Sequence, residues 1–314
     1  MKLQTIVPLD AAKKPMGYDS QILTLGSCFA EHIGKWLQYY KVRSVLNPFG
    51  ILFHPLAIEN LISRAMAEKE YTKADIFFLN ERWHCFDGHS VLSSASEATL
   101  LDKLNEGLQQ TRQQIKGASH ILITLGTAWV YRNITSGAVV ANCHKVPQKQ
   151  FTKELLSLDE VASSLERIIN LVRSSNPQVQ LVFTVSPVRH LKDGFVENQQ
   201  SKAHLIAALH KVLKEESISY FPSYEIMMDE LRDYRFYAED MVHPNDLAIR
   251  YIWEKFKESW VGKKAYPVME KVGEVQRGLN HRPFDPNSVQ HIAFVKSLKE
   301  KMDVLKQSYP YMEF

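Results

Sequence analysis

Short apolar runs alternate with amphipathic stretches along most of this chain of 314 residues. The apolar runs have the length and composition of buried strands. They cover residues 21–25, 42–45, 120–125, 179–185 and 218–221. The stretches between them repeat apolar residues every three or four positions, which predicts helices. These helices begin near residues 28 and 55 and cover residues 97–116, 156–174, 196–213 and 247–260.

Strands that alternate with helices predict an α/β fold, with a central parallel sheet and helices on both of its faces. One segment departs from this alternation. Residues 129–133 and 138–142 are two short β-type runs on either side of the turn sequence Thr135-Ser136-Gly137, which predicts a hairpin.

The end of the chain has a different pattern. Residues 266–286 show little periodicity and carry several charges, whereas residues 288–308 predict an amphipathic helix. This helix either packs back on the preceding domain or contacts a partner. We therefore expect an α/β domain over residues 1–262 and a C-terminal extension, mostly helical, over residues 263–314.

Polar and glycine-rich segments follow the predicted strands directly. They are Ser27, the run from Asn47 to Gly50, Gly126-Thr127 and Ser186-Pro187. Because the carboxyl ends of parallel strands lie at one edge of a sheet, we expect these segments to meet there and to form the functional site.

Three residues predict acyl-transfer chemistry. Asp240 precedes His243 by three positions, so one short loop can join the carboxylate and the imidazole. Ser27 lies where a strand ends and a helix begins, which gives the chain order Ser…Asp…His of a serine hydrolase. In this interpretation Ser27 is the nucleophile, His243 the general base and Asp240 the group that orients the imidazole. The free N–H groups of the helix would hold the oxyanion.

Structural roles are the alternative for each of these residues. Serine is a common helix N-cap, and Asp240 with His243 can simply cap the loop before the helix that Pro244 opens. Cys28 offers a thiol nucleophile beside His243, but we expect it to be a small buried residue. Asn198, Ser201 and His204, three residues apart, share one helix face, which either borders the pocket or, as we expect, is solvated. His54, His144 and His190 lie near site-side loops, where they either make structural hydrogen bonds or line a polar pocket.

Composition excludes several classes of function. Hydrophobic residues make up 45% and charged residues 23%, as in ordinary globular proteins, and the net charge of +3 is too small to predict nucleic-acid binding. We find no nucleotide-binding motif, and His84, Cys85 and His89 lack the paired spacing of a zinc site, so no metal or other cofactor is expected. Three cysteines, no signal peptide and no membrane-spanning run together predict a cytoplasmic protein that does not bind membranes.

Several motifs, in order, resemble the GSCFA domain family, which is related to the SGNH (GDSL-like) hydrolases. They are GSCFA (26–30), NPFGILFHP (47–55), ITLGTAWVY (123–131), NCHKVP (142–147), SPVRH (186–190) and DMVHPN (240–245). The resemblance covers roughly residues 20–260. It implies a flavodoxin-like three-layer α/β/α sandwich of the SGNH type, and a triad of Ser27, Asp240 and His243.

The resemblance also implies the groups that hold the oxyanion: the N–H of the nucleophile, the N–H of Gly50, and an asparagine in a G-x-N motif. Here the third motif reads Gly126-Thr127-Ala128-Trp129 and has no asparagine, so Asn142 or Thr127 is the candidate replacement. Asn47, Gly126, His144 and His190 complete the expected substrate-binding set. The first motif reads G-S-C where relatives have G-D-S, which shifts the serine by one position.

The sequence therefore predicts a serine esterase, and the family suggests an O-acylated carbohydrate or a small-molecule ester as the substrate. An acyltransferase would use the same triad and differ only in the second acceptor. A non-catalytic carbohydrate-binding or scaffold protein with the same fold is the alternative that the missing asparagine favours. The acyl group, the alcohol and the oligomeric state are not determined by the sequence.

Overall fold

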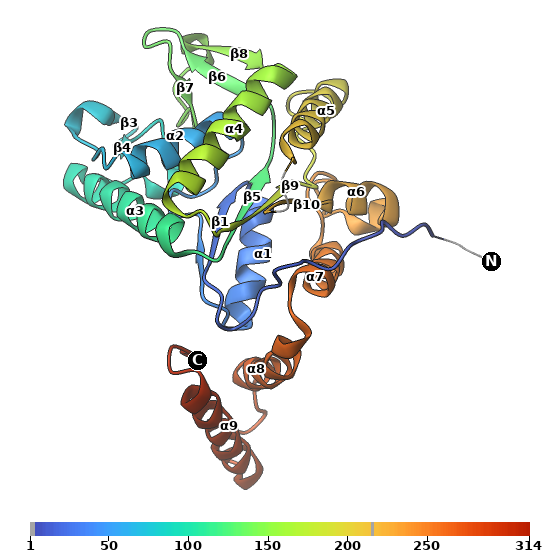
Figure 1. The fold of residues 1–314 in the computed structure, drawn as a ribbon. Helices are drawn as coiled ribbons and strands as arrows, with labels where there is room; N and C mark the ends of the chain where they lie inside the picture. Colours follow the sequence, from blue (N-terminus) through green and yellow to red (C-terminus); the bar gives the residue numbers. More distant parts are fainter. Residues whose placement is uncertain (1–3, 215–216) are drawn as a thin grey trace.

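Five parallel strands form the central sheet of the computed structural model, which describes residues 4–214 and 217–314. These strands are β1 (Ile22–Gly26), β2 (Ser44–Leu46), β5 (His120–Leu125), β9 (Gln180–Val185) and β10 (Ile218–Phe221). They lie side by side in the order β10-β9-β5-β1-β2 (Figure 1). This flavodoxin-like order has its switch point between β1 and β5, and the carboxyl ends of the strands at such a point are where binding sites form in folds of this kind. The predicted α/β fold is confirmed.

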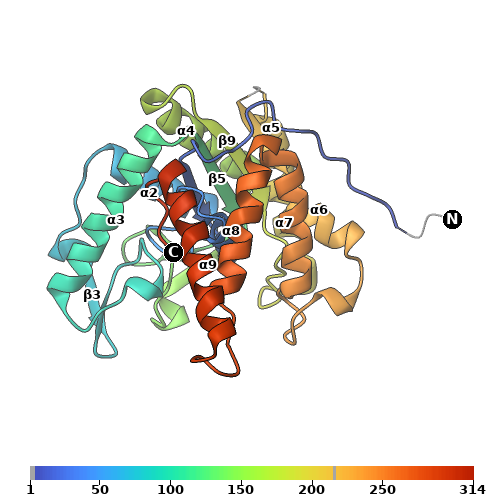
Figure 2. The same cartoon turned by 90° about the horizontal axis from the view of Figure 1, so that it is seen from below.

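Helices cover both faces of the sheet, because strand side chains alternate between two cores (Figures 1 and 2). In β1, for example, Leu23 and Leu25 face one core and Ile22 faces the other. The first core is closed by α2 (Pro55–Met66), α3 (Glu97–Gly117), α4 (Leu158–Ser175) and α5 (Phe195–Val212). The second is closed by α1 (Cys28–Tyr39) and α7 (Asp246–Trp260). A short helix, α6 (Ser223–Glu225), follows β10.

A small lobe lies beside the main sheet and contains the remaining strands. It consists of the antiparallel pair β3 (Phe77–Leu79) and β4 (Arg82–His84) and the sheet formed by β6 (Trp129–Asn133), β7 (Val139–Val140) and β8 (Phe151–Leu155). Val140, Val146 and Phe151 form its core, against which Phe77 and Phe86 pack. The predicted β6–β7 hairpin is confirmed. The pair β3–β4 and strand β8 were not predicted, because their side chains alternate between a very small core and solvent.

The C-terminal segment consists of two helices, α8 (Tyr266–Leu279) and α9 (Val289–Ser308), which lie at the bottom of Figure 1. The expectation of an aperiodic stretch was wrong for α8, because Met269, Val272 and Val275 form a buried stripe against the core that α1 and α7 share. The amphipathic helix at the end is confirmed as α9. The domain boundary after residue 262 stays a prediction.

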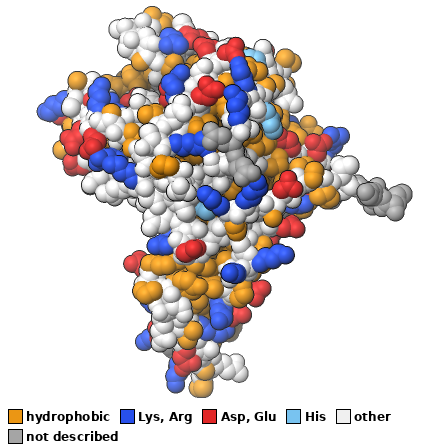
Figure 3. All heavy atoms as spheres, viewed as in Figure 1, with side chains coloured by type: hydrophobic (Ala, Val, Ile, Leu, Met, Phe, Trp, Pro, Cys, Tyr) orange, Lys and Arg blue, Asp and Glu red, His pale blue; other side chains and the backbone are white. Residues whose placement is uncertain are grey.

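Helix α9 is only partly covered by the rest of the chain. It packs against α8 and buries Leu298 and Leu305. Several of its other apolar side chains are exposed, and hydrophobic side chains gather over this lower part of the molecule in Figure 3. None of the helices built from the described residues is both long and apolar enough to cross a lipid bilayer.

Candidate active site

The loop before α7 holds Asp240 and His243 in direct contact. Asp240 Oδ2 lies 2.6 Å from His243 Nδ1, while Oδ1 accepts the backbone N–H groups of Val242 (2.9 Å) and His243 (3.0 Å). The His243 side chain is 48% exposed, and within the described part of the chain no hydrogen-bond partner is found for its Nε2. The imidazole is therefore oriented through one nitrogen and open at the other.

The same contacts control the charge of the carboxylate. The N–H and the imidazole of His243, together with the N–H of Val242, lower the pKa of Asp240 to about 2. Asp240 is therefore ionised at neutral pH. An ionised carboxylate on Nδ1 favours the tautomer that leaves Nε2 free to accept a proton.

Ser27 begins α1 as its N-cap. Its Oγ accepts the N–H of Phe29 at 3.4 Å, and its own N–H donates to the carbonyl of Thr124 at 3.0 Å. The residue has 0% relative exposure, and no described contact joins it to His243. The structure thus gives Ser27 the capping role that was the alternative to catalysis. Its role as nucleophile stays a prediction, and in this structure its N–H is not free for an oxyanion.

Cys28, the next residue, lies differently. It is only partly buried, so the expectation of a small buried residue was wrong. Burial raises the pKa of its thiol, whereas Lys202 and the backbone N–H groups of Phe29 and Cys28 act against this rise. Cys28, and not Ser27, is thus the partly accessible side chain at the switch point of the sheet.

The turn after β2 contributes Asn47 and Gly50. Asn47 Oδ1 accepts the N–H of Gly26 at 2.9 Å, and the N–H of Gly50 donates to the Asn47 carbonyl at 2.7 Å. Gly50 has φ +68°, and a Cβ there would come within 2.6 Å of His89 Cβ, which explains the glycine. Because the Gly50 N–H is already bonded, an oxyanion role for Gly50 requires that turn to open, and it stays a prediction.

The segment after β5 is held against the β1–α1 turn. The N–H groups of Gly126 and Thr127 both donate to the carbonyl of Phe53, at 2.7 and 3.0 Å. A Cβ on Gly126 would lie 3.1 Å from that carbonyl and 3.3 Å from Ser27 Cβ, so glycine permits the close approach. Thr127 Oγ1 contacts Ser201 Oγ at 3.0 Å. These two residues therefore shape the site, and no free backbone donor is found at either of them.

Helix α5 supplies polar side chains that point at the loops of the sheet edge. Asn198 Oδ1 accepts the N–H of His190 at 2.8 Å, and Ser201 Oγ accepts the N–H of Ala128 at 2.7 Å. Both Asn198 and Ser201 are buried, so the expectation of a solvated face was wrong for them. The physical reason is that the loops after β5 and β9 fold over this face of the helix.

Lys202 is the functional candidate that the sequence patterns did not identify. It is 1% exposed, and its Nζ donates to the carbonyls of Gly126 (2.7 Å) and Ser186 (2.8 Å), which follow β5 and β9. Burial lowers its pKa to about 7, with the thiol of Cys28 acting in the opposite direction. A signal was present in the sequence, because Lys202 lies three and seven positions before Leu205 and Leu209, on the apolar stripe of α5.

His190, in the segment after β9, is affected by the charges of both Lys202 and His243. Burial, followed by the charges of Lys202 and His243, lowers its pKa to about 3, so it is neutral at neutral pH. Its Nε2 is buried without a hydrogen-bond partner, and its ring packs edge-on against Phe53. The N–H of Arg189 donates to the carbonyl of Val242 at 3.2 Å, which ties the loop after β9 to the His243 loop.

Asn142 and His144 belong to the small lobe. Asn142 Oδ1 accepts the N–H of His144 at 2.8 Å, and His144 Nε2 lies 2.6 Å from the carbonyl of Cys85. Burial lowers the pKa of His144 to about 4. No described contact joins either residue to Ser27 or His243, so their substrate-binding roles stay predictions.

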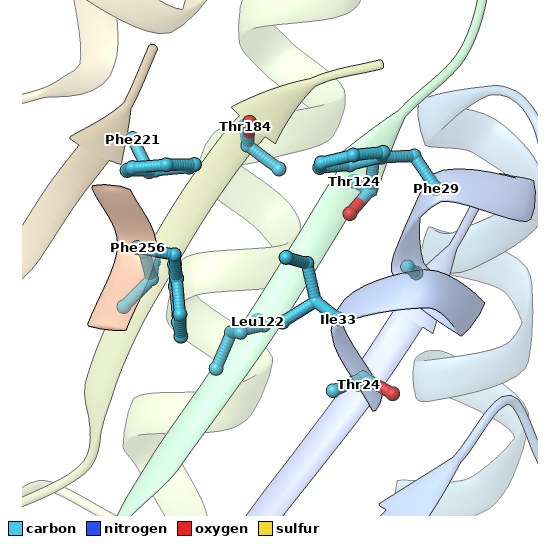
Figure 4. Close-up of a pocket in the computed structure, with 10 residues that line it drawn as sticks. Thr24, Phe29, Ile33, Leu122, Thr124, Thr184, Phe221 and Phe256 are labelled. Carbon is cyan, nitrogen blue, oxygen red and sulfur yellow. The ribbon is translucent and has the colours of Figure 1, made fainter. Parts of the chain in front are cut away.

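Figure 4 shows a small cavity inside the core, between the sheet and helices α1 and α7. Thr24, Thr124 and Thr184 line it from three neighbouring strands, opposite Phe29 and Phe256. Its volume of about 10 Å³ is room for about one water molecule, so it is not a substrate site. In residues 4–214 and 217–314 no group of three His, Cys, Asp or Glu side chains has the arrangement of a metal site.

Comparison with known proteins identifies the family. The GSCFA family model matches residues 21–256, and the model of the GSCFA domain protein C-terminal domain matches residues 272–314. No curated protein matches the chain.

Among solved structures, a carbohydrate esterase family 3 from Talaromyces cellulolyticus is 13% identical to this chain, with a TM-score of 0.28. The match covers 51% of this chain and 65% of the esterase, which is less than two thirds of the length of the esterase. An acetyl esterase mutant with acetate ion is 12% identical with a TM-score of 0.31, over 81% of this chain and 99% of that one. Structural similarity at these TM-scores does not support a conclusion about function. The family model does decide the family, since it spans most of the sequence: this chain belongs to the GSCFA family.

Proposed function

We propose that this protein is an ester hydrolase that works through an acyl-enzyme intermediate, with His243 as its general acid–base group. The observation that carries the proposal is the 2.6 Å contact between His243 Nδ1 and Asp240 Oδ2, with Nε2 left open. An imidazole held in this way by a carboxylate accepts a proton from an attacking group and returns it to a leaving group.

The proposed reaction has two halves at the carboxyl edge of the sheet. In the first, a nucleophile on the β1–α1 turn attacks the acyl carbon, and the alcohol leaves. In the second, water attacks the acyl-enzyme after His243 removes one of its protons, and the acid is released. Ser27 is the nucleophile that the sequence predicts, and to attack it must first rotate away from its contact with the N–H of Phe29.

The substrate that we propose is an ester of a carbohydrate or another polyol. Support comes from the sequence resemblance and from the polar side chains that border the site, Asn47, Thr127, His190 and Asn198. An acyltransferase would share the first half of the reaction and deliver the acyl group to a second hydroxyl instead of water. Release of free acid in the absence of any added alcohol distinguishes the hydrolase.

The test is hydrolysis of p-nitrophenyl acetate and of acetylated oligosaccharides by the full-length protein. We expect turnover, and we expect His243→Ala to lower kcat by about 10²–10⁴-fold. His281→Ala is the matched control, because His281 is an exposed histidine beyond the end of α8. Equal rates for the wild type, His243→Ala and His281→Ala would contradict the proposal.

A further inference from the structure

Two adjacent side chains at the β1–α1 turn can in principle attack an acyl group, and their surroundings differ. Ser27 is fully buried, its hydroxyl caps α1, and its N–H is bonded to Thr124. Cys28 is partly exposed, and the backbone N–H groups of Phe29 and of Cys28 itself approach its sulfur. Among the described contacts, none uses the N–H of Cys28 in another hydrogen bond. Cys28 is therefore partly exposed, and its N–H has no partner other than its own sulfur among the described contacts.

Lys202 has an unusual set of partners beside the β1–α1 turn. Its Nζ is bonded to Gly126, which packs against Ser27, and its charge acts on the thiol of Cys28. Its Nζ donates to two carbonyls, those of Gly126 and Ser186, and it forms no ion pair with any carboxylate in the described part of the chain. The titratable groups that face it are Cys28 from α1 and His190 from the loop after β9, and the Tyr224 ring lies 5.5 Å from Nζ. Neither histidine nor tyrosine offers it a negative charge at neutral pH.

The number of protons on Lys202 follows from these partners. A neutral amine has two N–H groups and one lone pair. The two carbonyls engage both N–H groups, so the lone pair is free to accept a proton from the thiol of Cys28. If the amine is instead protonated, it has a third N–H that the two carbonyls do not accept, and this N–H can be donated to a thiolate. Burial favours the neutral amine, because it lowers the pKa of Lys202 to about 7.

Asn47, in the turn after β2, provides a second, independent observation beside the β1–α1 turn. Its Oδ1 is fixed on the N–H of Gly26, which also establishes which side-chain atom is the nitrogen. Asn47 is 7% exposed, and its Nδ2 is buried without a hydrogen-bond partner among residues 4–214 and 217–314. A buried amide donor is rarely left unpaired. A negatively charged oxygen formed at the turn would provide the missing acceptor.

We propose that Cys28 is the nucleophile of this site and that Lys202 accepts its proton, with the N–H of Cys28 and Asn47 Nδ2 as donors to the oxyanion. The inference rests on the proposed ester hydrolysis and replaces Ser27 by its neighbour. Reactive cysteines are found at helix N-termini and near basic side chains. Cys28 is the first residue of α1, and the charge of Lys202 opposes the rise that burial causes in the pKa of its thiol.

The proposed step balances as follows. The thiol proton moves to Lys202 Nζ as the sulfur forms a bond to the acyl carbon. The carbonyl electron pair moves to oxygen, and its return breaks the acyl C–O bond. The departing alkoxide takes the proton from Lys202. In the second half, His243 removes a proton from water and the hydroxide attacks the thioester carbon, which moves the carbonyl electron pair to oxygen. Its return breaks the C–S bond, and the departing thiolate takes the proton from His243, so that both side chains regain their starting states.

The first test measures alkylation of the full-length wild type by iodoacetamide at pH 7, with the modified residue identified by mass spectrometry. Cys143 is the matched control, because it is also partly buried and burial alone raises the pKa of its thiol. We expect Cys28 to react at least about tenfold faster than Cys143. Equal or slower reaction of Cys28 would overturn the proposal, and this comparison requires no variant to fold.

The second test uses variants in the p-nitrophenyl acetate assay. We expect Cys28→Ala to lower kcat at least about 100-fold and Ser27→Ala to retain activity within about tenfold, once melting curves show that both are folded. In Lys202→Met the ratio of Cys28 to Cys143 alkylation should fall to about one. Loss of activity in Ser27→Ala but not in Cys28→Ala would overturn the inference and leave ester hydrolysis standing. A wild type without ester hydrolysis whose Cys28 is nevertheless alkylated rapidly would instead overturn the proposed function and support the reactive pair.

Discussion

The edge of the main sheet and the small lobe both contain histidines, and His243 and His84 show a difference between the two regions: whether a ring nitrogen is both unpaired and exposed. In the lobe, His84 contacts Ser93 Oγ (2.7 Å) and the carbonyl of Leu79 (3.0 Å), so both ring nitrogens have partners. At the sheet edge, His243 is oriented through Nδ1 and open at Nε2. Lys202 Nζ likewise has hydrogen-bond acceptors for only two of the three protons that it can carry, among the described residues.

This difference shows why residue type alone does not identify a site. His144 and His243 were both expected at the substrate. His144 is buried, with Nε2 on a backbone carbonyl and with Nδ1 unpaired among the described residues but closed off from solvent, whereas His243 lies half-exposed beside an ionised carboxylate. A reacting group needs a position that the folded protein leaves open, and this property depends on tertiary contacts that a motif does not contain.

The largest expected effect is a loss of activity on substitution at the sheet edge. Asp240→Asn should lower kcat by about 10²-fold or more with little change in KM, because the carboxylate sets the tautomer of His243. Asp233→Asn is the matched control, since Asp233 is also exposed and bonds only to Arg235 in the preceding turn. An Asp240→Asn variant with the kcat of the wild type would show that the oriented imidazole at the sheet edge is not needed for activity.

The second effect is on stability and belongs to the lobe. His144→Ala removes the partner of the Cys85 carbonyl and leaves a cavity beside Phe77 and Phe86. We expect a loss of about 2–4 kcal/mol in the free energy of unfolding, with kcat/KM per folded molecule unchanged within about twofold. Urea denaturation and the ester assay measure the two quantities. A large loss of activity in a stable variant would show that the lobe contributes to substrate binding.

A smaller effect concerns acidification. His54 caps α2 by accepting the N–H of Ala57 on Nδ1, and burial lowers its pKa to about 4. The unfolded chain therefore binds the proton more readily than the folded protein. The contribution of His54 to the free energy of unfolding is complete above pH 6.5 and falls as the pH drops toward 4. The free energy of unfolding should decrease by up to about 1.4 kcal/mol per pH unit in this range. Measurements at pH 7 and pH 5 check this, and His54→Asn, which keeps a capping side chain, should show a weaker dependence.

Much of the fold could be predicted from the sequence, because the buried strands are continuous apolar runs with distinct ends. The bounds of β5 and β10 agree with the predicted ones for this reason. Strands β3, β4 and β8 were not predicted, since they pack on a core too small to impose a pattern. Helix α8 was not predicted either, because its stripe becomes apparent only when the core next to α1 and α7 is known.

The candidate site was predicted only in part. Asp240 and His243 are close in sequence, and their contact follows from the local loop. The proposed pair of Cys28 and Lys202 depends on contacts of α5 with the ends of β5 and β9, which no local pattern encodes. The resemblance to hydrolases with a serine in this turn favoured Ser27, although exposure favours its neighbour.

The most direct test of acyl transfer at this edge is to locate the acyl group. The wild type and His243→Ala are mixed with p-nitrophenyl acetate, quenched in acid, digested and mapped by mass spectrometry. We predict one acetyl group on the peptide that spans the β1–α1 turn, attached to Cys28, which persists longer in His243→Ala because water is no longer activated. Ester hydrolysis that depends on His243 without any acyl group on this turn, at residue 27 or 28, would contradict the account.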